Sequence, residues 1–313
     1  MSEFSHVSVL LHETVDALQV HPGGIYVDGT LGGGGHSSYL LEKMGTDGTL
    51  VGIDQDSEAI LAAKKRISDD YDVFYINRNF SDIKEILEEC RIEKIDGAML
   101  DLGVSSHQLD EAERGFSYRF DAPLDMRMNR SAGLTAYDVV NTYSEEQLAN
   151  VIFTYGEEKF ARKIARVIVS RRQRQPVATT FELVDAIRAA MGSKAYSADK
   201  HPAKRTFQAI RIEVNGELDV LQTALTDFFD CLKPGGRLAV ITFHSLEDRM
   251  VKQCFQRLCT GCTCPPSFPV CVCGKQPAGK LVWKKAVTAG QQEVAQNPRA
   301  KSAKLRVIEK LAL

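Results

Sequence analysis

Acidic residues and glycines near the start of the chain stand where an adenosine-containing cofactor could bind. Asp28 ends a short apolar run, and four glycines at positions 32–35 follow closely. A turn without β-carbons lets the backbone approach a ligand, and the helix after it offers free N–H groups to an anion. Asp54 ends the next apolar run, where a carboxylate can accept hydrogen bonds from both ribose hydroxyls. Together, these residues predict a site for an adenosine cofactor.

The spacing of the glycines indicates which kind of cofactor this is. The dinucleotide pattern G-x-G-x-x-G needs a third glycine three positions after Gly34 or Gly35, and the sequence has Ser37 and Ser38 there. A nicotinamide oxidoreductase is therefore disfavoured, although it stays an alternative at this point. An acidic residue followed by glycines at alternate positions instead resembles motif one of the S-adenosylmethionine-dependent methyltransferases, with Thr30 in place of the first glycine.

The elements that must position these residues alternate between strand and helix. Apolar runs predict strands at 25–28, 50–53, 73–76, 97–100 and 237–243, and helical spacing predicts helices at 36–44, 57–67 and 83–90. Strands separated by crossover helices form a parallel sheet, and strands without strict alternation are covered on both faces. The sequence predicts an α/β, doubly wound, Rossmann-like sheet. Ser57 is expected to cap the second helix, and 305–308 is expected to be an edge strand.

The alternation stops after Gly103 and resumes near Phe207. Because a crossover needs only a dozen or more residues, the excess predicts an inserted domain. Residues 144–153, 157–172 and 180–191 carry apolar residues three or four apart, so the insertion is mainly helical. We place the catalytic domain, which would bind the cofactor, at 1–108 and 204–313, and the inserted helical domain, which would recognise the substrate, at 109–203.

Seven short sequence segments, spread over nearly the whole chain, are similar to the bacterial ribosomal RNA small-subunit methyltransferase H family. They are residues 28–36, 100–106, 114–117, 123–128, 154–158, 205–209 and 243–249. The resemblance implies S-adenosylmethionine-dependent methylation of the N4 exocyclic amine of a cytidine in the decoding region of small-subunit (16S) rRNA. It also implies small-subunit rRNA or the small ribosomal subunit as partner. A catalytically silent RNA-binding or assembly factor with the same fold is the alternative.

The resemblance also implies which residues contact the cofactor. They are Gly34, Gly35, His36, Asp54, Phe80, Asp101 and Gln108. The glycines and His36 stand at a helix start that could meet a carboxylate, Asp54 suits the ribose, and Phe80 could stack on adenine. His36 could instead make a local hydrogen bond, and Phe80 could simply pack in the core.

Asp101, at the end of the fourth predicted strand, is the candidate catalytic residue. A cytosine amine has its lone pair delocalised into the ring, so an acceptor that orients its N–H groups and receives a proton assists methyl transfer. The alternative is that Asp101 only holds the cofactor. The sequence has Asp101-Leu102-Gly103-Val104 where many amino-methyltransferases have Asn/Asp-Pro-Pro-Tyr, so the N4 assignment rests on the resemblance. The chain has no Pro-Cys pair, which weighs against cytosine C5 as the target.

A basic segment in the insertion is the candidate RNA surface. Residues 159–174 include seven basic side chains and no acidic one, in a chain whose net charge is -2. Helical spacing separates these cations from an apolar face, so the segment can be packed on one side and contact phosphates on the other. Arg162, Lys163, Arg166 and Arg171 are the chosen contacts. Lys200, Lys204, Arg205 and Arg211 could extend the surface.

Cysteines crowd into the C-terminal part of the chain. Cys262, Cys264, Cys271 and Cys273, with Cys259 upstream, could supply four thiolates to zinc. The C-x-C spacing differs from the usual C-x-x-C pairs, so we expect reduced surface thiols or an opportunistic metal rather than a zinc site. Any metal here would be structural.

The composition indicates a globular chain. Its 313 residues are 44% hydrophobic and 26% charged, and no apolar run approaches the ~18 residues of a membrane span. The N-terminus shows no export signal, so we expect a cytoplasmic protein without a membrane partner. The pattern does not indicate the oligomeric state.

Overall fold

The computed structural model describes the chain except for residues 1–7, 193–200, 263, 266–269, 271–272 and 313. It contains two compact units. The sheet unit consists of Met1–Gly103 and Asp219–Leu313, and the helical unit is Val104–Leu218. Each unit has its own hydrophobic core.

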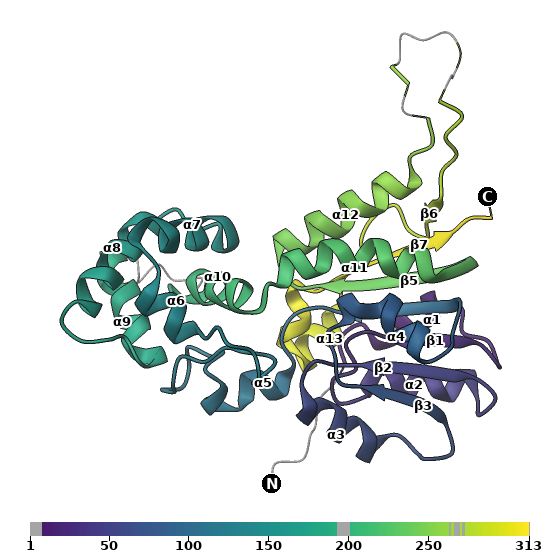
Figure 1. Ribbon diagram of the computed structural model, residues 1–313, viewed down its shortest axis with the longest axis horizontal. Helices are drawn as coiled ribbons and strands as arrows, with labels where there is room; N and C mark the ends of the chain where they lie inside the picture. The colour runs from purple at the N-terminus through teal and green to yellow at the C-terminus, as the bar shows by residue number, and fades with distance from the viewer. Residues whose placement is uncertain (1–7, 193–200, 263, 266–269, 271–272, 313) are drawn as a thin grey trace. The chain divides into compact units, whose positions relative to one another are not determined.

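A twisted sheet with strand order β3-β2-β1-β4-β5-β7-β6 forms the centre of the sheet unit (Figure 1). Its strands are β1 (Ile25–Asp28), β2 (Thr49–Ile53), β3 (Asp72–Ile76), β4 (Ile95–Asp101), β5 (Leu232–Thr242), β6 (Gly279–Leu281) and β7 (Lys304–Lys310). The first five strands are parallel, whereas β7 runs antiparallel to both β5 and β6. The order 3-2-1-4-5 is that of a doubly wound fold, as predicted.

β7 is an interior strand, so the expectation of an edge strand is wrong. It lies between β5 and the short strand β6. Its neighbouring residues Val307 and Ile308 point to opposite faces, and both are buried. A strand buried on both faces is typical of the inside of a sheet.

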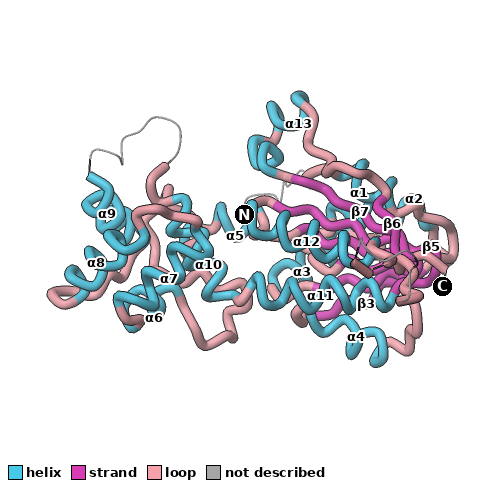
Figure 2. The backbone as a smooth tube through the Cα atoms, turned by 90° about the horizontal axis from the view of Figure 1, so that it is seen from above, coloured by secondary structure: helices cyan, strands magenta, loops and turns pink. Residues whose placement is uncertain are grey.

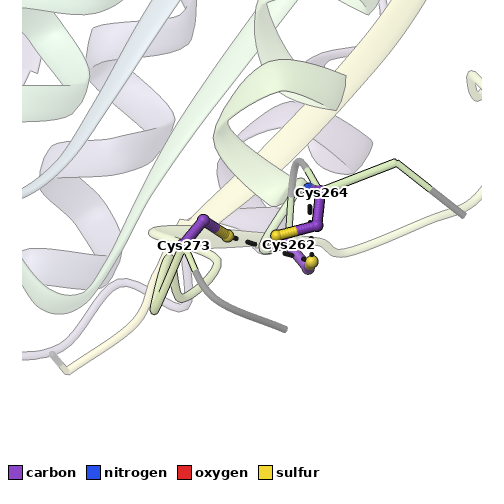
Figure 3. A group of neighbouring side chains, drawn as sticks. All are labelled: Cys262, Cys264 and Cys273. Atoms are coloured by element: carbon purple, nitrogen blue, oxygen red, sulfur yellow. Dashed lines mark hydrogen bonds between the residues drawn. The ribbon is translucent and has the colours of Figure 1, made fainter. Parts of the chain in front are cut away.

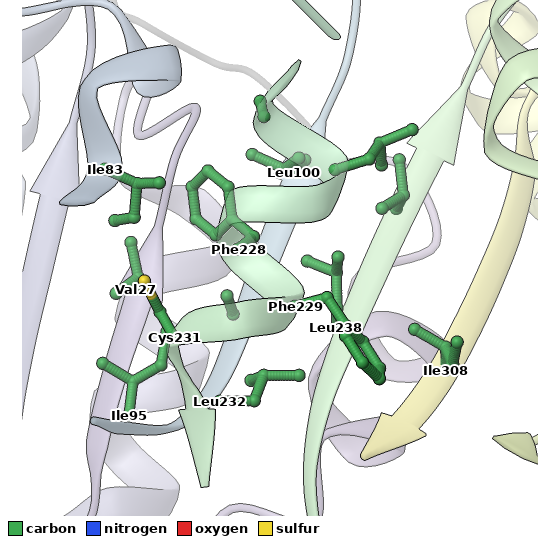
Figure 4. Close-up of a cluster of buried hydrophobic side chains, with 14 of the residues drawn as sticks. Val27, Ile83, Ile95, Leu100, Phe228, Phe229, Cys231, Leu232, Leu238 and Ile308 are labelled. Atoms are coloured by element: carbon green, nitrogen blue, oxygen red, sulfur yellow. The ribbon is translucent and has the colours of Figure 1, made fainter. Parts of the chain in front are cut away.

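Helices cover both faces of this sheet. They are α1 (Leu11–Ala17), α2 (Gly35–Met44), α3 (Ser57–Arg66), α4 (Ile83–Glu89), α11 (Glu217–Cys231), α12 (Ser245–Cys259) and α13 (Gln291–Gln296), with short 3₁₀ turns at Phe80–Asp82 and Pro298–Ser302. On one face, Val27, Ile83 and Phe228 share a buried cluster (Figure 4). On the other face, Leu40 and Leu50 belong to a second cluster. The prediction of a sheet covered on both sides is confirmed.

The start of α3 differs from expectation by one residue. Asp56, not Ser57, is the N-cap, and its side chain accepts a hydrogen bond from the Glu58 backbone N–H at 3.1 Å. An ionised cap is also favoured by the positive end of the helix dipole.

The helical unit is built from helices and loops (Figure 2). Its helices are α5 (Ser106–Asp110), α6 (Ala136–Thr142), α7 (Glu145–Gly156), α8 (Ala161–Arg172), α9 (Thr180–Met191) and α10 (Lys204–Asn215), with a 3₁₀ turn at Ala112–Arg114. Capping boxes at Thr135, Ser144 and Thr179 set the starts of α6, α7 and α9.

The helical unit is larger than the insertion expected at 109–203. It extends to Leu218 because α10 packs into its core through Phe207, Ile210 and Val214. The spacing of apolar residues shows that α10 has a buried face, but it does not show which core that face joins. The helix therefore belongs with the insertion rather than with the sheet.

Candidate active site

The candidate site lies at the carboxyl edge of the four neighbouring strands β3, β2, β1 and β4. Asp28 ends β1, Asp54 follows β2, Phe80 follows β3, and Asp101 ends β4. These strands are parallel, so their carboxyl ends meet at one edge, where doubly wound sheets bind ligands. The fold thus brings together residues that are separated by more than 70 positions in the sequence.

Asp28 organises the glycine turn between β1 and α2. Its Oδ1 accepts the Thr30 N–H at 3.1 Å, and its Oδ2 accepts the Ser37 hydroxyl at 2.7 Å. Gly32 (φ 52°) and Gly34 (φ 76°) are both left-handed, a conformation that side chains with a β-carbon rarely adopt. Gly34 is the N-cap of α2, so the turn leads directly to the free N–H groups of that helix.

The glycine turn also orients Asp54. Its Oδ2 accepts the Gly32 N–H at 2.8 Å, and its Oδ1 accepts the Asp56 N–H at 2.9 Å. Burial raises the pKa of Asp54 to about 6 against the lowering effect of these two hydrogen bonds. Each carboxylate oxygen has room for a second donor, so Asp54 can still accept two ribose hydroxyls.

Asp101 presents a buried acceptor at the same edge. Its Oδ1 is inaccessible to solvent and has no hydrogen-bond partner within the described residues. Its backbone N–H donates to the Thr30 hydroxyl at 2.6 Å, which ties the end of β4 to the glycine turn. Burial, together with the negative charges of Asp28 and Glu247, raises the pKa of Asp101 well above its usual value. A buried acceptor that no described residue satisfies is typical of a position that a substrate or cofactor completes.

His36 lies between the N-terminal segment and Asp101. Its Nε2 is 3.0 Å from the Val9 carbonyl, which can only accept, so this nitrogen carries a proton. Its Nδ1 lies 3.8 Å from Asp101 Oδ2. The local hydrogen bond that we considered for His36 is therefore present, and it holds the ring beside the candidate catalytic carboxyl.

Phe80 and Gln108 lie in different units. Phe80 is half-buried and packs against the cluster that contains Phe228. A β-carbon on Gly29 would stand 3.3 Å from the Phe80 β-carbon, so Phe80 borders the glycine turn. Gln108 is buried in the helical unit, where its Oε1 accepts the Ser105 N–H at 3.1 Å. The structure thus gathers the sheet-unit residues at one edge and assigns Gln108 to the other unit.

Two site residues were missed by the sequence reasoning. Ser37 counted only as a break in the dinucleotide pattern, yet its hydroxyl satisfies Asp28. Thr30 counted only as a replaced glycine, yet it bridges Asp28 and Asp101 through its N–H and its hydroxyl. The signal was present in both cases, since a hydroxyl residue next to a buried aspartate is a ready hydrogen-bond partner.

The basic segment only partly fits its expected role. In α8, Arg162, Lys163 and Arg166 are exposed opposite the buried Ile164 and Ile168. Arg171 is also exposed. Arg166 lies 3.5 Å from Glu145, an exposed pair that contributes little.

Two other cations in the helical unit have structural roles. The Arg172 guanidinium donates to the Val140 and Tyr143 carbonyls at the end of α6. Arg211 forms two hydrogen bonds to Glu217, at 2.8 and 2.7 Å. The expectation that Arg211 extends the RNA surface is therefore wrong. Lys200 lies outside the described residues.

Three of the cysteines converge. The Sγ atoms of Cys262, Cys264 and Cys273 lie within 4.8 Å of one another (Figure 3). Cys271, the fourth candidate, lies outside the described residues. The predicted alternatives, reduced surface thiols or an opportunistic metal on one side and zinc on the other, stay predictions at this point.

Buried Asp28 predicts a pH dependence of stability. Burial raises its pKa from 3.8 to about 6, so the folded state holds the proton more tightly than the unfolded chain does. The protonated Asp28 side chain therefore stabilises the fold fully below its unfolded pKa of 3.8. This contribution, roughly 3 kcal/mol, is lost as pH rises through the folded pKa of about 6. Asp28→Asn removes the charge, keeps an acceptor for the Thr30 N–H, and replaces the second acceptor with an amide that can donate to the Ser37 hydroxyl. We expect its free energy of unfolding, measured by urea denaturation, to fall less steeply over this range than that of the unaltered protein. Equal slopes would contradict the prediction, and the exposed Asp47→Asn change is the matched control.

Taken together, a doubly wound sheet with an antiparallel β7 beside β5, a glycine turn and carboxylates ending its strands define a Rossmann-like methyltransferase. The methyl donor of this class is S-adenosylmethionine. The chain belongs to the MraW methylase family, whose model matches residues 3–311. This is a family of methylases, not of nicotinamide oxidoreductases.

Curated relatives match over their whole length. The chain is 57% identical over 309 residues to the ribosomal RNA small subunit methyltransferase H of Clostridium botulinum (strain Kyoto / Type A2), covering 99% of this chain and 100% of the relative. It is 54% identical over 312 residues to the protein of the same name from Ruminiclostridium cellulolyticum. An rRNA methylase structure from Streptococcus thermophilus aligns with a TM-score of 0.45 and 12% identity, covering 98% of this chain and 100% of that one. No helix among the described residues is long and apolar enough to cross a membrane.

Proposed function

We propose that this protein uses S-adenosylmethionine to methylate small-subunit ribosomal RNA, and that the target is the N4 exocyclic amine of a cytidine in the decoding region. The relatives' shared name supports rRNA as substrate. The observation that carries the chemistry is the buried, unsatisfied Asp101 Oδ1 at the edge where Asp54 and the glycine turn meet.

The residues at this edge fit the proposed cofactor. Asp54 has two oxygens oriented by backbone N–H groups, which suits the two ribose hydroxyls. The first turn of α2, starting at Gly35 and His36, presents backbone N–H groups toward a carboxylate. Phe80 borders the turn and offers an aromatic surface to the adenine. When bound, S-adenosylmethionine supplies an electrophilic methyl group.

Asp101 is proposed to act on the amine that receives the methyl group. Its raised pKa means that burial disfavours the ionised form, so the carboxylate that does form is a strong acceptor. An acceptor at this position would orient an N–H of the amine and would take its proton when the methyl group leaves the donor sulfur, whose bond to carbon breaks as the N–C bond forms. His36, held by Val9, keeps a ring nitrogen beside the other Asp101 oxygen. Most of the remaining catalysis comes from positioning.

The helical unit is proposed to bind the RNA. The exposed side of α8 carries Arg162, Lys163 and Arg166, and Phe153 of the neighbouring helix α7 is also exposed. Exposed cations suit phosphates, and an exposed aromatic ring offers a stacking surface to an unstacked base. The target base must leave its stack to reach the methyl donor.

The direct test measures transfer of a labelled methyl group from S-adenosylmethionine to small ribosomal subunits and to naked rRNA, followed by mass spectrometry of the nucleosides. N4-methylcytidine is the expected product, and the better substrate shows whether assembled RNA is recognised. Label on another atom would overturn the N4 assignment. If the cofactor binds but neither RNA is labelled, the rRNA assignment fails.

Neutralising the basic side of α8 is expected to weaken RNA binding. The triple change is Arg162→Gln, Lys163→Gln and Arg171→Gln. We expect the affinity for RNA to fall about 10- to 100-fold. We also expect the slope of log affinity against log salt concentration to become less steep by about three. The matched control is Lys65→Gln, Lys252→Gln and Arg257→Gln, which removes three exposed cations from the sheet unit. Filter binding across a salt series measures both quantities, and equal losses in the two variants would rule out a specific role for α8.

A further inference from the structure

We propose that the thiolates of Cys262, Cys264 and Cys273 form a binding site for one Zn²⁺ ion in the segment between α12 and β6. All three Sγ atoms lie within 4.8 Å of one another and point to a common centre (Figure 3). The site belongs to the sheet unit and is separate from the carboxyl edge described above. The proposal does not rest on the proposed function.

The sulfur separation matches zinc geometry. The Sγ atoms of Cys262 and Cys273 are 3.8 Å apart. Two thiolates bound to one tetrahedral ion at Zn–S distances of about 2.3 Å are separated by about 3.8 Å. A disulfide requires about 2.05 Å, so these two sulfurs are spaced as ligands of one ion rather than as a covalent pair.

Local chemistry favours thiolates at this position. The Cys264 backbone N–H points at Cys262 Sγ at 3.4 Å, and such a donor stabilises the deprotonated sulfur. Residues 260–292 contain no Asp, Glu or His, so the ligands available in this stretch are thiols. Thiolate ligands select zinc over the oxygen-preferring Mg²⁺ and Ca²⁺. The C-x-C spacing disfavoured zinc at first, but it does not keep the sulfurs of Cys262 and Cys264 apart, since they lie within 4.8 Å of each other.

The ends of the segment are already fixed. The Ala278 N–H donates to the Leu258 carbonyl at 2.9 Å, and the Leu311 N–H donates to the Ala278 carbonyl at 2.8 Å. An ion held by Cys262, Cys264 and Cys273 would cross-link the chain just beyond this anchor. The three thiolates fill three of the four positions of a tetrahedral zinc ion, and because this site is separate from the carboxyl edge, the ion would contribute to folding of the segment rather than to methyl transfer.

The test uses the full chain, purified under reducing conditions and loaded with Zn²⁺ or Co²⁺. Elemental analysis is expected to give one zinc per chain, and the Co²⁺ form is expected to show a thiolate charge-transfer absorption. We expect each single change, Cys262→Ser, Cys264→Ser or Cys273→Ser, to weaken zinc binding by more than about 100-fold. Loss of a group that only supports a ligand costs up to about 100-fold, and loss of a ligand itself should cost more. Cys90→Ser, which removes a half-buried thiol outside the cluster, is the matched control and should bind like the unaltered chain.

A second measurement covers variants that fail to fold. In the unaltered chain, zinc should protect the three thiols from alkylation, and a chelator should expose them, as mapped by mass spectrometry of peptides. The proposal is overturned if zinc is not retained, if protection falls on other cysteines, or if the triple serine variant binds equally well. A Cys262–Cys273 disulfide in the reduced preparation would also overturn it.

Discussion

Replacing Asp54 by alanine is expected to reduce S-adenosylmethionine affinity by about 100-fold or more. The carboxylate would accept both ribose hydroxyls, and hydrogen bonds to a charged group contribute about 1.5–3 kcal/mol each. Losing two of them costs at least about 3 kcal/mol, which corresponds to about two orders of magnitude in Kd. The change also removes the acceptor that fixes the Gly32 N–H, so the glycine turn loses part of its support. Isothermal titration with the cofactor measures the effect.

The controls separate a lost contact from a lost fold. Asp47→Asn removes an exposed carboxylate of the same unit and should leave Kd unchanged. Asp54→Asn keeps one oxygen as an acceptor, so its Kd should fall between those of the alanine variant and the unaltered protein. A folded Asp54→Ala protein, checked by circular dichroism, that binds the cofactor with normal affinity would show that the ribose is held elsewhere.

Replacing Asp101 by asparagine is expected to lower the methyl-transfer rate about 100- to 10,000-fold with little change in cofactor Kd. Asparagine fills the same volume and still accepts a hydrogen bond, but it cannot take a proton from the amine. General-base catalysis contributes about this much to a rate. Single-turnover transfer to RNA measures the chemical step, and titration measures cofactor binding. This split distinguishes proton acceptance from the alternative in which Asp101 only holds the cofactor, because that role predicts a raised Kd.

The pH profile gives an independent check on Asp101. The base must be ionised to act, and burial raises its pKa well above the usual range. The single-turnover rate of the unaltered protein should therefore rise with pH until Asp101 is deprotonated, and the asparagine variant should lack this rise. A rise of the same size in both proteins would assign the titration to another group.

Much of the sheet unit could be predicted from the sequence. The apolar runs that became β1, β2 and β4 are short and mostly buried, whereas β3, at the edge of the sheet, is only partly covered. Each of the four runs ends at a polar residue. Asp28, Asp54 and Asp101 are placed by strand order alone, because the fold brings the carboxyl ends of parallel strands to one edge. The position of the candidate site in the fold could therefore be predicted before any side-chain contact was known.

Contacts between distant residues could not be predicted in this way. The pattern marks Arg172 and Arg211 as cations, but it does not show that Arg172 donates to α6 carbonyls or that Arg211 pairs with Glu217. The same limit applies to α10, whose apolar face joins the core of the helical unit, and to β7, which lies inside the sheet. In each case the periodicity shows that a face is buried but not what covers it.

The sequence by itself determined the order of strands and helices, the glycine turn, the acidic residues that end the strands and the family resemblance. These depend on local spacing and residue type, which the chain carries along its length. Only the tertiary structure decided that Asp101 keeps a buried acceptor with no partner among the described residues, that Thr30 links the Asp28 carboxylate to the Asp101 backbone N–H, and that three cysteine sulfurs converge. The physical reason is that burial, charge and ligand geometry depend on which distant segments pack together, and packing is a property of the whole fold.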